Sequence, residues 1–324
     1  MNEKIVKQIR QNKFVENLIV FLKKIRFRGG KISLYFILKT FIQKLAQDEL
    51  LERANAVAFS FTLAIFPAVL FLFTLIPFIH NFIPSVDNES IMTFIGQVMP
   101  PNMYSIIEAT VYDIVSHSRG DLLTFGFLMS LYLATNGTMS LISAFNSRYK
   151  VSHKRKRSYI KTRLVALWLT VVLAFVVISS ILLLVVGEYA VNYLIEHSPI
   201  DIDNLTIYML LVTRFIVLFI VFWVAISSLF YFGPEVHSNW SFFSYGSFTA
   251  TILSLAASYL FSTYIAQFGT YNKLYGSIGV MIALMIWIMI LSVILLVSYE
   301  LNAAIHHATQ LTKDKRNHPM LEEQ

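Results

Sequence analysis

The sequence predicts an all-α, polytopic membrane protein with about six transmembrane helices and both termini in the cytoplasm. Three observations lead to this prediction. The chain is 56% hydrophobic and only 14% charged, whereas soluble domains carry about 25% charged residues. Six apolar runs are long enough to cross a hydrocarbon core of roughly 30 Å. Lysine and arginine also gather on one side of the resulting topology, as the positive-inside rule requires.

Residues 1–53 precede the first apolar run and are rich in lysine and arginine. Apolar residues recur between the basic ones at helical spacing, so we predict N-terminal amphipathic helices separated at Gly29-Gly30. Such helices can lie in the membrane interface or pack on the cytoplasmic ends of the bundle, and the pattern does not separate these alternatives. Because no short apolar core is followed by a cleavage site, we expect the first long apolar run to remain as a span.

The predicted membrane domain covers residues 54–304, and a cytoplasmic tail follows at residues 305–324. Each span should be a helix, because a helix satisfies its own backbone hydrogen bonds in hydrocarbon. The fifth span is the weakest, since Ser, Thr and Gly dilute it. The predicted spans are residues 56–80, 122–145, 164–187, 206–232, 243–266 and 277–304.

Positive charge sets the orientation of these spans. Twelve lysines and arginines precede the first span, eight lie in residues 146–163 and three follow residue 305. The loops on the other side carry only Arg119 and Lys273. The basic loop is better explained as a topology anchor that touches anionic lipid than as an RNA-binding patch. We therefore expect membrane lipids, and no nucleic acid, as partners.

Two loops on the outer side carry further predictions. The first, between spans 1 and 2, is about 40 residues long, too long for a simple connection; we predict two short helices on the outer leaflet, broken at Pro100-Pro101. The second lies between spans 5 and 6. There Asn272 and nearby glycines predict a tight turn, with Ser277 capping the last span.

Two ionisable residues lie inside predicted spans, where a charge costs about 2.5–3.5 kcal/mol on insertion scales. Arg214 could line a polar cavity or hold an anionic head group; alternatively it extends to the interface or bonds a neighbouring helix, for example at Glu188. Glu300 lies near the inner end of the last span, where a structural ion pair is the simpler interpretation. Its candidate partners are Arg53, Arg148 and Arg163.

Uncharged residues within the spans add two further candidates. Asn136 lies at mid-membrane in the second span and either bonds a neighbouring helix or lines a pathway. Pro67 and Pro77 each remove a backbone hydrogen bond from the first span and predict helix kinks.

Recognisable motifs for catalysis or cofactor binding are missing from the sequence. The chain has no cysteine, which excludes disulfides and thiolate metal ligands. Its eight histidines form no HExxH cluster, and neither a P-loop nor a GxSxG segment occurs. We therefore expect no metal, no cofactor and no enzymatic activity.

Three segments carry a resemblance to a known family. They are Ala54–Pro67 at the first span, Tyr231–Glu235 with Trp240, and Ser262–Gly279 continuing through Trp287 to Glu300–Ala303. Over roughly residues 45–307 the chain resembles the YihY/BrkB family of bacterial inner-membrane proteins.

The chain also departs from the family pattern. Phe59 and Phe61 stand where the family usually has tyrosines, and Ala64 stands where it usually has serine. Residues 297–299, Val-Ser-Tyr, replace a common Gly-Ala pair. These departures weaken any role assigned to those hydroxyl groups.

The resemblance implies a six-helix protein of the bacterial inner (cytoplasmic) membrane. Such proteins were formerly called ribonuclease BN, an activity that the missing metal cluster argues against. The family is linked to envelope integrity and serum resistance, and transport of a lipid or lipid precursor has been suggested for it. By position, the resemblance draws attention to Asn272, Tyr275, Gly276, Glu300 and Asn302.

Together these observations favour a transporter or passive flippase-like protein for an amphiphilic envelope component. Arg214 would hold an anionic head group, Asn136 would line its path, and Glu300 with Asn302 would organise the inner gate. The alternative is a non-transporting scaffold for envelope proteins, in which the same residues join helices. Further copies of the chain also remain open as partners.

Overall fold

The computed structural model describes residues 20–22, 24–27, 32–46, 49–80, 112, 120–147, 157–197, 204–235, 241–266 and 269–317. The fold is all-α, as predicted. Two short strands, β1 (Arg26–Phe27) and β2 (Ile32–Ser33), pair antiparallel just before the first long helix. The helices are α3 (Leu34–Ala46), α4 (Leu50–His80), α7 (Gly120–Asn146), α8 (Tyr159–His197), α9 (Asn204–Phe232), α10 (Tyr245–Ala266) and α11 (Gly269–Asn317).

Six of these helices are long and apolar enough to cross a membrane. They are α4 and α7 to α11, which confirms the six spans expected from the sequence. The placement of both termini in the cytoplasm stays a prediction. So do the two short helices of the first outer loop and the amphipathic helix before Gly29-Gly30, which fall almost entirely outside the described residues.

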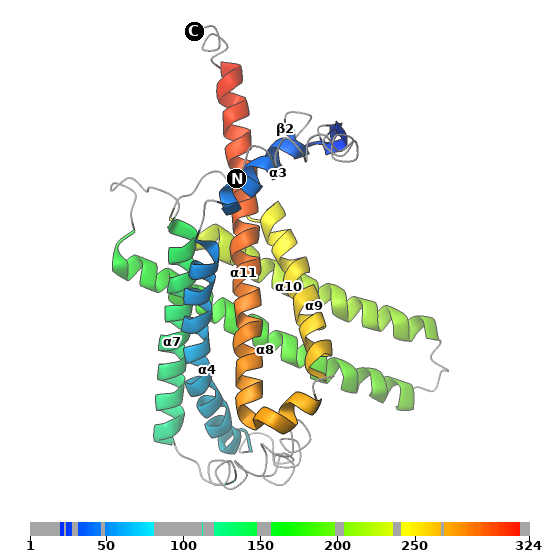
Figure 1. The fold of residues 1–324 in the computed structure, drawn as a ribbon. Helices are drawn as coiled ribbons and strands as arrows, with labels where there is room; N and C mark the ends of the chain where they lie inside the picture. The colour runs from blue at the N-terminus through cyan, green and yellow to red at the C-terminus, as the bar shows by residue number, and fades with distance from the viewer. Residues whose placement is uncertain are drawn as a thin grey trace.

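The predicted tight turn between the last two spans is wrong in its position. Helix α11 begins at Gly269, so Asn272, Gly276 and Ser277 lie within its first turns. A glycine in a helix interior costs about 1 kcal/mol relative to alanine. Figure 1 shows this first part of α11 bent sharply away from the rest, so the chain changes direction within the helix and not in a loop before it.

The six spans form a ring in which each helix packs against the next. Contacts join α4 to α7, α7 to α8, α8 to α9, α9 to α10 and α10 to α11, and α11 closes the ring on α4. Figure 1 shows α4, α7 and α11 side by side, whereas α8 and α9 lean away from α11.

A buried apolar cluster lies at one end of this ring, which we call the basic end. It is the end at which α4, α8 and α10 begin and α7 and α9 end, and it carries the basic segments of the sequence. The cluster combines the following residues from all six spans: Leu50, Ala54, Val57, Leu141, Ile142, Ala144, Phe145, Ala166, Leu169, Ile226, Leu229, Phe230, Ala250, Leu296 and Tyr299. At its centre the Phe145 and Tyr299 rings stack with centroids 4.3 Å apart.

Helices α4 and α7 approach closely at two glycines of α7. A Cβ atom on Gly126 would lie 3.1 Å from the backbone nitrogen of Phe71, and one on Gly137 would lie 2.7 Å from the Phe61 ring. Helix α4 runs unbroken through Pro67 and curves along its length in Figure 1. That Pro67 and Pro77 cause the curvature stays a prediction.

Helix α3 packs across the part of α11 that extends beyond the basic end of the ring. Ile37 is 2% exposed and contacts Leu301 and Ile305. The other face of α3 leaves Ile42 exposed. This helix therefore contacts the bundle through one face, while its predicted contact with the membrane interface stays a prediction.

Candidate functional site

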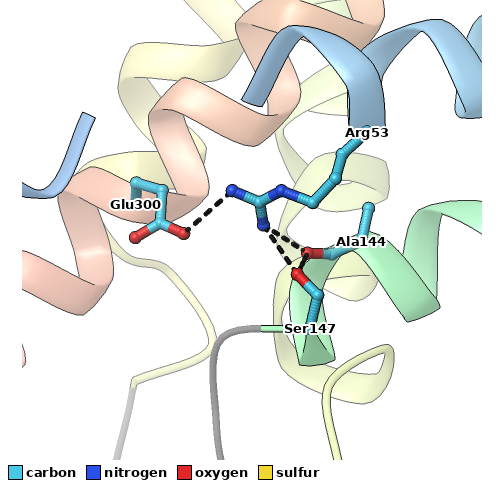
Figure 2. A network of polar contacts seen from close by, with 4 residues as sticks. All are labelled: Arg53, Ala144, Ser147 and Glu300. Atoms are coloured by element: carbon cyan, nitrogen blue, oxygen red, sulfur yellow. Dashed lines mark hydrogen bonds and ion pairs between the residues drawn. The ribbon is translucent and has the colours of Figure 1, made fainter. Parts of the chain in front are cut away.

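Arg53 joins three helices at the basic end (Figure 2). From the first turn of α4, its Nη1 donates to the carbonyl oxygen of Ala144 at 2.7 Å and to Oγ of Ser147 at 2.9 Å. Its Nη2 lies 3.9 Å from Oε1 of Glu300 on α11. The guanidinium therefore links the first, second and last spans of the ring.

Helix geometry explains why an arginine fits this position. The last four carbonyl groups of a helix lack intrahelical partners, and a cation near them also interacts favourably with the helix dipole. Arg53 supplies that cation to the end of α7. Glu300 is 1% exposed, and a buried carboxylate requires a positive partner. The ion pair at 3.9 Å is longer than a charge-assisted hydrogen bond of about 2.7–2.9 Å.

Asn302, one half-turn beyond Glu300, holds the beginning of α10. Its Oδ1 accepts a hydrogen bond from the backbone N–H of Gly246 at 2.7 Å, and its Nδ2 donates to Oγ of Ser244 at 2.7 Å. A Cβ atom on Gly246 would lie 2.3 Å from the carbonyl oxygen of Ser298, so α10 abuts the backbone of α11 here. Arg53, Ser147, Ser244, Glu300 and Asn302 together form what we call the polar latch.

Serines extend this polar network to α9. Ser244 and Ser247 form a capping box, because the backbone N–H of each donates to the Oγ of the other, at 3.1 and 3.2 Å. Oγ of Ser247 also accepts a hydrogen bond from Oγ of Ser227 at 2.9 Å. Ser227 and Ser247 are fully buried, so these hydroxyl groups satisfy one another inside the bundle.

Arg157 caps the end of α9 in the way that Arg53 caps α7. Its guanidinium donates to the carbonyl oxygens of Phe232, Gly233 and Pro234 at 2.9, 3.2 and 3.2 Å. Burial lowers the pKa of Arg157, and the charge of Glu235 opposes this change. One residue of the basic loop thereby fixes the Tyr231–Glu235 segment.

Arg163 on α8 meets Asn136 on α7 deeper in the bundle. Its Nη1 donates to Oδ1 of Asn136 and lies 3.1 Å from Sδ of Met139. Its guanidinium carbon lies 4.6 Å from the ring centroid of Tyr132. The seam between α7 and α8 thus holds a half-buried arginine.

The residues singled out from the sequence fall into two groups. Glu300, Asn302 and Asn136 make the contacts described above, and Arg53 is the candidate partner that lies beside Glu300. The others lie in α9 or in the first turns of α11, and their side chains fall outside the described part of the chain. They are Arg214, Asn272, Tyr275 and Gly276.

Sequence reasoning missed Arg157 and the serines of the network. The spacing Ser244-x-x-Ser247 before an apolar run is a signal for a helix start and could have located the capping box. Nothing in the local sequence of Arg157 identifies the carbonyl groups it binds, because they lie 75 residues or more along the chain.

Comparison with known proteins agrees with the resemblance noted in the sequence. The ribonuclease-like protein YfkH of Bacillus subtilis (strain 168) is 27% identical over 281 residues, which cover 87% of this chain and 99% of the relative. No solved structure matches the chain. Within the described residues, no three His, Cys, Asp or Glu side chains group in a way that could hold a metal ion. The family model for virulence factor BrkB matches residues 41–322, and this multi-pass membrane protein therefore belongs to the BrkB family.

Proposed function

We propose that this protein is a transporter, or a passive flippase-like protein, that moves an amphiphilic lipid or lipid precursor across the bacterial cytoplasmic membrane. The observation that carries the proposal is the asymmetry of the ring. A buried core and the polar latch join the spans at the basic end, whereas α8 and α9 lean away from α11 at the opposite end (Figure 1). A transporter opens its path to one side of the membrane at a time, and a ring joined at one end suits that behaviour.

The polar latch would serve as the inner gate. Arg53 and Glu300 are held near each other at 3.9 Å, without the short contacts of a bidentate pair. An ion pair of this length can separate and re-form at lower cost than a bidentate pair in the same environment. Asn302 would keep α10 aligned with α11 as the gate moves, because it bonds the first residues of α10.

Arg214, in the outer part of α9, would hold the anionic head group of the lipid. This assignment rests on the position of Arg214 within a span. Charged residues inside membrane spans are rare, and they commonly mark substrate or ion pathways. In this scheme the latch controls access from the cytoplasm, and Arg214 receives the head group on the other side.

Lipid movement in liposomes tests the proposal. The purified protein would be reconstituted, and movement of a labelled anionic phospholipid between leaflets would be compared for wild type, Arg214→Ala, Glu300→Gln and the control Asp121→Asn. Asp121 is an exposed carboxylate at the opposite end of α7, outside the latch. We expect wild-type protein and the control to accelerate movement, Arg214→Ala to lose it, and Glu300→Gln to change its rate.

Two results would contradict the proposal. Lipid movement no faster than in empty liposomes, for anionic and zwitterionic phospholipids alike, would remove transport and favour the scaffold. Movement that is unchanged in both Arg214→Ala and Glu300→Gln would remove the roles assigned to these two residues.

A further inference from the structure

Arg163 is held rigidly by one face of α7. Tyr132, Asn136 and Met139 are spaced four and three residues apart, so they line up on one side of that helix. They contact the guanidinium of Arg163 through a ring face, an amide oxygen and a thioether sulfur. These contacts fix the direction of the guanidinium, while the Arg163 side chain remains partly exposed.

The site lies well below the polar latch. Asn136 precedes Ala144, the residue that Arg53 contacts, by eight positions on α7. At about 1.5 Å per residue, Arg163 therefore meets α7 roughly 12 Å further into the span than Arg53 does. A cation at that depth is costly and calls for a negative partner.

Arg163 lacks such a partner among the described residues. It forms no ion pair with a carboxylate there, and its Nη2 and Nε groups donate no hydrogen bond, since its polar contacts go through Nη1. Arg157 differs, because both of its Nη atoms donate to carbonyl oxygens. The Nη2 and Nε groups of the Arg163 guanidinium therefore remain available as hydrogen-bond donors at the seam between α7 and α8.

We propose that Arg163 binds the phosphate of an anionic phospholipid that enters this seam from the bilayer. A guanidinium fork matches a phosphate group through two parallel hydrogen bonds. Apolar side chains next to these residues in the two helices are exposed, as acyl chains require: Leu128, one turn before Tyr132, is 58% exposed, and Leu164, which follows Arg163, is 60% exposed. The inference adds a site that the proposed function does not assign, and lipid can bind there whether or not it is transported.

Lipid retention by the intact chain tests this site. The protein in detergent would be mixed with equal amounts of phosphatidylglycerol and phosphatidylcholine with the same acyl chains, and bound lipid would be counted by native mass spectrometry. Wild type should retain the anionic lipid about tenfold better, the effect expected of a charge-assisted hydrogen bond. Arg163→Gln should lose this preference. Arg163→Lys should keep part of it, because lysine carries the positive charge but cannot form the two parallel hydrogen bonds of a guanidinium.

The matched control is Lys161→Gln, which removes an exposed cation of the same helix turn. This variant should retain phosphatidylglycerol as wild type does. Equal retention by wild type and Arg163→Gln would overturn the proposal, and so would an equal loss in Lys161→Gln. Inorganic phosphate tests whether the site prefers a soluble anion to a lipid. If phosphate displaces the lipid at millimolar concentration, the site takes a soluble anion and the lipid assignment fails.

A measurement on wild type alone guards against a variant that fails to fold. A photoactivatable phosphatidylglycerol should crosslink to peptides covering residues 128–139 and 160–168, and crosslinking confined to other spans would overturn the proposal. Failure here is distinguishable from failure of the proposed function. Specific retention at Arg163 without lipid movement in liposomes would leave this site standing and remove transport only.

Discussion

The two ends of the ring differ in how their helices are joined. At the basic end the six spans share a buried cluster, and side chains of one helix cap the ends of another. Large exposed apolar side chains occur at both ends, for example Ile160 at the basic end and Leu260 toward the opposite end, 68% and 66% exposed, so exposure alone does not distinguish the ends. Figure 1 shows α8 and α9 diverging from α11 toward the opposite end. Apolar length therefore makes a helix a span, whereas polar groups and small residues join one span to another.

The physical reason is that lipid is as apolar as leucine. Helices in a membrane therefore gain little from apolar contact as such, and they associate through close packing and hydrogen bonds. The basic end supplies both. Ala54, Ala166 and Ala250 are fully buried and let the backbones approach, while Ser227 and Ser247 bond across helices.

The largest effect is expected from Glu300→Ala. Removing one partner of a buried ion pair costs about 3–5 kcal/mol, and the Arg53 side chain, which is only 14% exposed, would lose the carboxylate beside it. The free energy of unfolding in detergent measures this loss. Asp121→Asn, at the opposite end of α7, should change it little, and equal losses in both variants would show that the ends do not differ.

The next effect comes from shortening leucines at the two ends. Leu229 is 2% exposed at the basic end, and Leu229→Ala should cost about 2–5 kcal/mol through the cavity it leaves. Leu260, on the far part of α10, faces outward, so Leu260→Ala should cost much less. Similar losses of unfolding free energy for the two variants would contradict the asymmetry.

Gly246→Ala should be the third in size. The added methyl group would meet the carbonyl oxygen of Ser298 at 2.3 Å, so the start of α10 must shift at a cost of about 1–3 kcal/mol. The melting temperature should fall accordingly. Gly120→Ala provides the matched control, since nothing lies within 4 Å of its added Cβ; a larger fall in the control would sink this explanation.

The smallest effect concerns the hydrogen bond between Thr138 on α7 and Thr170 on α8, whose hydroxyl oxygens lie 2.8 Å apart. A double-mutant cycle with both threonines changed to valine should give a coupling of about 0.6 kcal/mol, the average for hydrogen bonds between membrane helices. A coupling of zero would mean that packing alone joins these two helices.

Features that depend on a single helix could be predicted from the sequence. The number of spans follows from apolar length, and the need of Glu300 for a cationic partner follows from the cost of a buried charge. Three cationic partners were compatible with Glu300, and the choice of Arg53 depends on how α4 packs on α7 and α11.

Features that depend on the crossing of helices could not be predicted in the same way. The pairing of Asn136 with Arg163 requires α8 to cross α7 obliquely, which no pattern within either helix encodes. The first turns of α11 were misjudged for the opposite reason. Glycine and asparagine there resemble a loop locally, but the chain changes direction within a helix.

Distance measurements between spin labels can compare how firmly the helices are held at the two ends, and because the chain has no cysteine, labels can be placed without removing native residues. One pair, Leu51→Cys with Tyr245→Cys, reports on exposed positions of α4 and α10 at the basic end. A second pair, Leu128→Cys with Leu260→Cys, reports on α7 and α10 toward the opposite end. In lipid nanodiscs, with the latch closed as it is in the structure, we expect a narrow distance distribution for the first pair and a broad or two-peaked one for the second. Equally narrow distributions, or a broader one at the basic end, would show that the helices are not held more firmly at the basic end.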